Sequence, residues 1–128
     1  FQVNTYIPND QSSPSITALV DGGFVITYQS QVPNENTTFD HGIDIYGQRY
    51  NISGEKVGDE FQVNTYTPQS QRTPNTTALS DGGFVVTWES FSHEEGATNN
   101  YDIYGQRFDS NGDMVGNEFK ANTSTNGW

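Results

Sequence analysis

Short stretches in which apolar and polar residues alternate run along the whole chain, and turn-forming residues separate them. Residues 24–29 show the pattern, with Phe, Ile and Tyr at every second position and Val and Thr among the intervening ones. Alternation with period two is typical of a β-strand, whose successive side chains point to opposite faces of a sheet. No stretch follows the period of an amphipathic helix, so the pattern predicts an all-β protein.

Turn signals divide this pattern into short strands. Asp21-Gly22-Gly23 favours a tight hairpin, because glycine accepts a positive φ at little cost, and the same residues return at 81–83. The expected strands are 15–19, 24–29, 45–50 and 60–64, followed by 76–79, 84–89, 103–108 and 118–122. A further strand, of the type that ends each repeat, is expected at 1–4.

The chain is a tandem repeat. Residues 1–30 share 19 identities in 30 with residues 61–90, at an offset of 60. Residues 44–63 share 11 identities in 20 with residues 102–121, at an offset of 58. We therefore expect repeat 1 at 1–60, repeat 2 at 61–118 and the start of a third repeat at 119–128, as in a window of a longer array.

Four short antiparallel strands in every 60 residues predict a β-propeller blade. Two blades cannot close a ring, since propellers typically have about four to eight blades. The expected fold is therefore two four-stranded antiparallel blades, which belong to a larger propeller or array or are closed into a ring by several chains. A linear array of small β-sandwich-like units is the alternative.

Three segments, DGGFVVTWES (81–90), IYGQRF (103–108) and VGNEF (115–119), resemble a tandem repeat of very large secreted or cell-surface proteins. These are mostly bacterial, of the RTX and adhesin types, and are often described as hemolysin-type calcium-binding proteins. The resemblance implies an extracellular or cell-surface location. It also implies that neighbouring repeats, of the same chain or of identical chains, are the partners.

Charge and composition exclude several partners. The 128 residues include 16 Asp and Glu against 5 Lys and Arg, for a net charge of -11. Nucleic acid is not an expected partner, because phosphate binding needs a basic surface. Direct membrane insertion is not expected either, because the longest apolar runs are only a few residues. The absence of cysteine excludes disulfides and thiolate metal sites.

The sequence does not predict an enzyme. His41 and His93 lie in the divergent segments 31–43 and 91–101, without a nucleophile in a recognised motif. No nucleophile-elbow, zincin or phosphate-loop pattern is present. A solvent-exposed loop histidine is the simpler interpretation of both residues.

A solvated acidic face is the simpler interpretation of the carboxylate-rich loops, and structural calcium is the candidate cofactor there, because hard cations suit such loops. The candidate ligands are Asp40 and Asp44 in one copy and Glu94, Glu95 and Asp102 in the other. The segment 109–113 has oxygen side chains at its first, third and fifth positions, but lacks the later Gly and Glu of an EF-hand. We therefore predict a turn there.

Matched aromatic residues such as Tyr28 and Trp88, or Tyr46 and Tyr104, are expected to pack in the core. Arg49 and Arg107 are expected to pair with nearby carboxylates such as Asp44 and Asp102. Side chains in or beside the divergent segments are better candidates for ligand binding, with a glycan as the ligand. These candidates are Phe39, His41, Phe91, His93 and Tyr101.

Glycosylation sequons occur at Asn36, Asn51, Asn75 and Asn122. Together these features predict a non-enzymatic extracellular module that serves adhesion or structure in a large surface or secreted protein. The alternative is a lectin in which two-blade chains assemble into a closed β-propeller with sugar sites between the blades.

Overall fold

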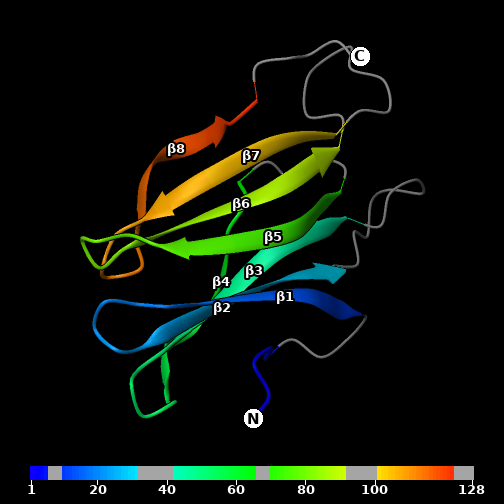
Figure 1. The fold of residues 1–128 in the computed structure, drawn as a ribbon. Helices are drawn as coiled ribbons and strands as arrows, with labels where there is room; N and C mark the ends of the chain where they lie inside the picture. The colour runs from blue at the N-terminus through cyan, green and yellow to red at the C-terminus, as the bar shows by residue number, and fades with distance from the viewer. Residues whose placement is uncertain (6–9, 32–41, 66–69, 92–100, 123–128) are drawn as a thin grey trace.

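The protein forms two four-stranded antiparallel sheets, one from each repeat (Figure 1). The computed structural model describes residues 1–5, 10–31, 42–65, 70–91 and 101–122. Strands β1 (Gln11–Ala18), β2 (Phe24–Gln31), β3 (Ile43–Tyr50) and β4 (Lys56–Gln62) make the first sheet. Strands β5 (Gln71–Ala78), β6 (Phe84–Phe91), β7 (Tyr101–Phe108) and β8 (Met114–Lys120) make the second. The expected all-β fold of two four-stranded antiparallel repeats is confirmed.

Several expected strands differ from the structure, since β1, β4, β5 and β8 all begin four or five residues before their predicted starts and the strand expected at 1–4 is absent. β4 begins at Lys56, four residues before the predicted start, because its pairing with β3 runs from Tyr50↔Lys56 to Tyr46↔Gln62. The strand predicted at 1–4 is wrong. β4 already fills the place beside β3, and residues 1–4 pair with no strand. Phe1 instead lies with its ring centroid 5.2 Å from that of Tyr50.

The Asp-Gly-Gly turns form as predicted, for reasons that the structure shows. Asp21 accepts a hydrogen bond from the Gly23 amide at 2.8 Å, and Gly22 has a φ of 89°. A Cβ on Gly23 would lie 2.3 Å from the backbone oxygen of Tyr50, so only glycine fits there. The turn therefore needs both glycines, one for its conformation and one for its close approach to β3.

Each sheet has two distinct faces, because side chains alternate along each strand. We call the A face the one with Val25, Thr27 and Ile45 in the first sheet, and with Val85, Thr87 and Ile103 in the second. We call the B face the one with Phe24, Ile26 and Tyr28 in the first sheet, and with Phe84, Val86 and Trp88 in the second.

The A face of the first sheet packs on the B face of the second. Phe61, at the end of β4, lies with its ring centroid 6.3 Å from Phe84 and 5.4 Å from Phe108. The hydroxyls of Thr27 and Thr76 are 2.6 Å apart in the buried contact. β5 is the strand of the second sheet that lies along the first sheet, and β8 is at the far edge (Figure 1).

The core lies between the sheets. Trp88, Phe84 and Phe108 are among the largest fully buried side chains, and the indole nitrogen of Trp88 donates to the amide oxygen of Gln71 at 3.1 Å. Trp88 and Tyr104 are buried there, as predicted from their recurrence, and Tyr28 is buried on the outer B face of the first sheet. Tyr46, on the outer B face of the first sheet, is only half-buried. Among the described residues, no helix is long and apolar enough to cross a membrane.

Gly47 gives a direct test of this packing. A Cβ at Gly47 would lie 2.7 Å from the Phe61 ring, and a Cβ at Gly105 would lie 2.6 Å from the Phe119 ring. Phe61 is held between the sheets, whereas Phe119 is exposed and its ring can swing away. We expect Gly47→Ala to lower the free energy of unfolding by about 1–3 kcal/mol, as overpacking does.

Gly105→Ala is the matched control, and we expect its cost to be clearly smaller. Urea unfolding of both variants measures the difference. Equal losses of stability in the two variants would contradict the claim that the Phe61 ring is packed more tightly than the Phe119 ring.

Candidate functional site

The carboxylate of Asp44 is part of a buried network at the start of β3. Asn64, just after β4, donates from its side-chain amide to Asp44 at 2.8 Å. Its amide oxygen accepts from the backbone N–H of Ile45 at 2.7 Å. Burial raises the pKa of Asp44 above its ordinary value of 3.8, and the hydrogen bond from Asn64 partly offsets this rise. The network ties the segment after β4 to the start of β3.

The second sheet repeats this network at Asp102. Asn122 donates to Asp102 at 2.9 Å and accepts from the backbone N–H of Ile103 at 2.8 Å. Lys120 adds an ammonium 3.5 Å from the other oxygen of Asp102. The two aspartates therefore occupy matching places in two different sheets and are not brought together into one site.

The calcium prediction has little support in this arrangement. Asp44 already accepts from an amide, and Asp102 lies beside an ammonium that disfavours a second cation. Within the part of the chain that the structure describes, no three His, Cys, Asp or Glu residues gather as a metal site would require. Asp40, Glu94 and Glu95 lie outside the described residues, so calcium binding stays a prediction.

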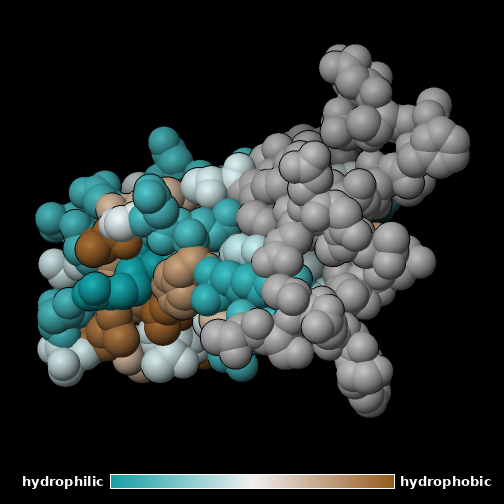
Figure 2. Space-filling view, turned by 90° about the horizontal axis from the view of Figure 1, so that it is seen from above, coloured by the Kyte–Doolittle hydropathy of each residue, from teal (hydrophilic) through white to brown (hydrophobic). Residues whose placement is uncertain are grey.

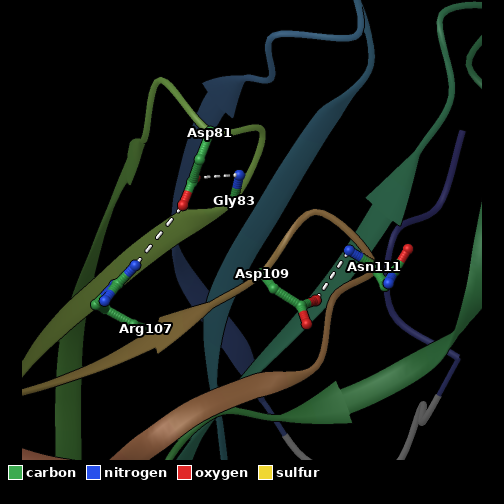
Figure 3. Close-up of polar contacts among 5 residues, drawn as sticks. All are labelled: Asp81, Gly83, Arg107, Asp109 and Asn111. Carbon is green, nitrogen blue, oxygen red and sulfur yellow. Dashed lines mark hydrogen bonds and ion pairs between the residues drawn. The ribbon is translucent and has the colours of Figure 1, made fainter.

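The segment 109–113 is a turn, as predicted. The Asp109 carboxylate accepts a hydrogen bond from the backbone N–H of Asn111 at 2.9 Å (Figure 3), and a second one from the backbone N–H of Asp113 at 3.0 Å. Asn51 holds the matching turn of the first sheet in the same way, through Ser53 and Glu55. The Asp109 oxygen that suggested an EF-hand-like ligand is therefore hydrogen-bonded to backbone N–H groups of the β7–β8 turn. Asn51 has the same role in the β3–β4 turn.

The predicted pairing of Arg49 with Asp44 is wrong. The two residues are five positions apart in one strand and so point to opposite faces of the sheet. Arg49 instead donates from its two terminal nitrogens to the backbone oxygens of Ser110 and Asn111, both at 2.8 Å. It thereby joins the first sheet to the β7–β8 turn of the second.

Arg107, the counterpart of Arg49, does not pair with Asp102 either. It lies 3.7 Å from the carboxylate of Asp81 in the β5–β6 turn (Figure 3). Both side chains are about half exposed, so this ion pair contributes little. The two arginines thus occupy matching positions and have different partners.

Two predicted ligand-binding residues come together in the second sheet. Phe91 and Tyr101 are directly opposite each other on β6 and β7, with ring centroids 4.9 Å apart. The guanidinium of Arg72, on β5, is 5.7 Å from the centre of the Tyr101 ring. We call these three residues the aromatic corner. The first sheet has Gln31, Ile43 and Ser12 in the matching places. Phe39, His41 and His93 lie outside the described residues.

The sequons differ in how available their amides are. The side-chain amides of Asn51 and Asn122 donate to Glu55 and Asp102, so a glycan on either would remove that bond. Asn75 is exposed on β5, and Asn36 lies outside the described residues. The structure therefore leaves Asn75 as the described sequon whose modification disturbs least.

The outer faces of both sheets expose apolar surface. β7 and β8 expose Ile103, Val115 and Phe119 on the outer A face of the second sheet. Seen from above, apolar side chains lie among hydrophilic ones in the coloured part of the molecule (Figure 2). On the opposite side, the B face of the first sheet has a hollow of about 150 Å³, whose lining includes Val3, Gln11, Pro14, Ile26 and Tyr28.

Comparisons with protein-family models, with curated proteins and with solved structures each gave no match for this chain. Sequence reasoning missed Asn64 and Asn122 as partners of the aspartates. The signal was present, since each asparagine follows its aspartate by 20 residues in both repeats.

The raised pKa of Asp44 predicts how its charge affects stability. The folded state binds this proton more tightly than the unfolded state, so the stability it adds is fully present below pH 3.8. That stability is lost as the pH rises through the folded pKa. We therefore expect Asp44→Asn to melt at a higher temperature than the parent at pH 7, and the gain to disappear near pH 3.

Asp102→Asn is the control, since it removes the ion pair with Lys120 and we expect it to lower the melting temperature at pH 7. Thermal melts by circular dichroism at both pH values measure these shifts. A lower melting temperature for Asp44→Asn at pH 7 would show that its carboxylate stabilises the fold.

Proposed function

We propose that the chain is a non-enzymatic structural or adhesion module of a large secreted or cell-surface protein, built by stacking like sheets face to face. The observation that carries the proposal is the contact between the repeats. The A face of one sheet packs on the B face of the next through Phe61, and the same side chains recur on the two outer faces. Neighbouring repeats are the partners that such faces fit.

Charge and sequence pattern support the extracellular part of the proposal. The net charge of -11 keeps a repetitive array of exposed sheet faces in solution, since like charges repel. The likeness of residues 81–90 and 103–108 to repeats of secreted and surface proteins supports the location. The described polar groups serve turns and sheet contacts, which suits a structural role.

We expect an antibody against this chain to label intact source cells or their medium, and to detect a polypeptide far larger than 128 residues on a denaturing gel. The module is a segment of an array, so its parent contains many repeats. The control is a cytoplasmic marker protein, which an antibody should detect in the same cells only after lysis. Signal only after lysis, or a parent of about this length, would contradict the proposal.

A lectin is the second candidate, and the aromatic corner favours it. Tyr101 is exposed between Phe91 and the guanidinium of Arg72, and aromatic rings stack on the apolar faces of sugar rings. In this function the corner would bind a glycan, whose hydroxyls the guanidinium of Arg72 can contact.

Tyr101→Ser and Tyr101→Phe separate sugar stacking from packing at the aromatic corner. We expect the parent and Tyr101→Phe to bind the same glycans on an array, and Tyr101→Ser to lose at least about tenfold in affinity with its stacking ring. Absence of glycan binding, or equal binding by all three proteins, would exclude the aromatic corner as a sugar site.

A further inference from the structure

The interface inside the chain shows which side chains become buried when two of these sheets stack. Ile45, on the A face of the first sheet, is 0% exposed, whereas its counterpart Ile103 in the second sheet is 38% exposed. Thr76, on the B face of the second sheet, is 6% exposed, whereas its counterpart Ile16 in the first sheet is 63% exposed. At these two positions the outer faces are less covered than their counterparts inside the chain, whereas Tyr28 and Tyr50 on the outer B face are only 4% and 3% exposed.

The hollow on the first sheet has the same explanation. Most repeat counterparts of its lining are buried, among them Val63 just after β4 and Gln71, Val86 and Trp88 in the second sheet, whereas Arg72, the counterpart of Ser12, is exposed. The hollow is therefore the unfilled half of the same interface. Pro14 is exposed at its rim, whereas its counterpart Pro74 is buried.

The outer A face of the second sheet carries Phe119, the counterpart of the phenylalanine Phe61 that packs in the internal interface. Phe61 fixes the internal interface by packing on Phe84 and Phe108, and Phe119 is its exposed counterpart at the end of β8. The matching receptor on the first sheet is the pair Phe24 and Tyr50, which stack with centroids 4.8 Å apart. Phe1 rests on this pair, 6.4 and 5.2 Å away, which shows that the receptor accepts a phenylalanine ring. Phe1 is 85% exposed, and a Phe119 ring from a second copy would have to displace it from the pair.

The polar contacts of the interface have counterparts as well. Arg49 donates hydrogen bonds to the backbone oxygens of Ser110 and Asn111. Arg107 occupies the matching position on the second sheet, on its outer A face. Ile52 and Ser53 occupy the matching turn of the first sheet. Their backbone oxygens can receive Arg107 once it leaves its weak ion pair with Asp81.

Glu89 takes the place of Gln29 on the outer A face. The side-chain oxygen of Gln29 accepts from the backbone N–H of Thr73 at 3.1 Å, and the counterpart of Thr73 is Ser13. Both residues have a positive φ, 52° at Ser13 and 55° at Thr73, so their backbones present this N–H in the same way. A carboxylate accepts at least as strongly as an amide oxygen.

We propose that a second copy of this chain docks its first sheet, by the B face, onto the A face of the second sheet. The proposal rests on the stacking part of the proposed function and names its residues. Phe119 of one copy enters the receptor of Phe24 and Tyr50 in the other, and Arg107 binds the turn at Ile52 and Ser53. The contact joins two different surfaces, so successive copies close into a ring or extend as a filament.

The net charge of each copy opposes this association. Two chains of charge -11 repel, and salt screens that repulsion while leaving the apolar contact intact. Association is therefore expected to strengthen between low salt and about 0.15 M salt. This separates it from contacts held by attraction between opposite charges, which weaken over the same range.

Two single variants, each of which damages one outer face, test the proposal on the 128-residue chain. Ile103→Asp places a charge on the A face, and Ile16→Asp places one on the B face. Both side chains are exposed within one copy, so neither variant disturbs its fold, which circular dichroism melts verify. Val115→Asp is the matched control, because Val115 and its counterpart Val57, beside the internal interface, are both 38% exposed.

Multi-angle light scattering over a range of concentrations gives the result. We expect the parent and Val115→Asp to exceed the mass of one chain, and each interface variant to weaken association by at least about tenfold. A mixture of Ile103→Asp with Ile16→Asp should form a one-to-one pair, since each supplies the face that the other has lost.

A parent that stays monomeric at all concentrations overturns the proposal, as does a mixture that fails to pair. If the parent associates and Val115→Asp dissociates it as strongly as Ile103→Asp does, the copies meet through another surface and the proposal is wrong. Surface labelling of the parent protein does not depend on association between copies. A failure here is therefore distinguishable from a failure of the proposed extracellular role.

Discussion

The contact between the A face of one sheet and the B face of the next is the interaction on which the rest of the structure depends. A single four-stranded sheet of this composition has little apolar surface, and one sheet cannot bury both of its faces. Stacking supplies the missing partner, since Phe61 reaches from β4 onto Phe84 and Phe108. Trp88 and Ile45 become buried in the same contact. The hydrophobic core of this protein is thus an interface between repeats.

This constraint explains residues that are otherwise puzzling. Gly47 is small because the Phe61 ring lies directly over it. Arg49 is directed at backbone oxygens of the neighbouring sheet, which fixes how far one sheet slides along the next. Asp44 and Asp102 each bind an asparagine two residues after the end of β4 or β8. These hydrogen bonds hold the chain just beyond the strand that carries Phe61 or Phe119. Their role is to position that segment, and they do not need a metal to do so.

The sequence predicts the sheets well and the contact between them poorly. Alternation and the Asp-Gly-Gly turns locate the strands, because both signals depend on local backbone geometry. Recurrence alone cannot tell which copy of a side chain is buried, since Ile45 and Ile103 are identical residues with different surroundings. The mistaken pairing of Arg49 with Asp44 was avoidable, because period two already places residues five apart on opposite faces. Phe39, His41 and His93, which are predicted ligand-binding residues of the divergent segments, lie outside the described structure and stay predictions.

A double-mutant cycle between Phe61 and Phe84 tests the central claim most directly. Phe61→Leu, Phe84→Leu and the double variant are unfolded in urea, and the coupling free energy is taken from the three losses of stability. Rings in contact between sheets predict a coupling of about 0.5–1.5 kcal/mol. Additive losses would show that the two side chains do not meet, and would contradict the stacking of the first sheet on the second.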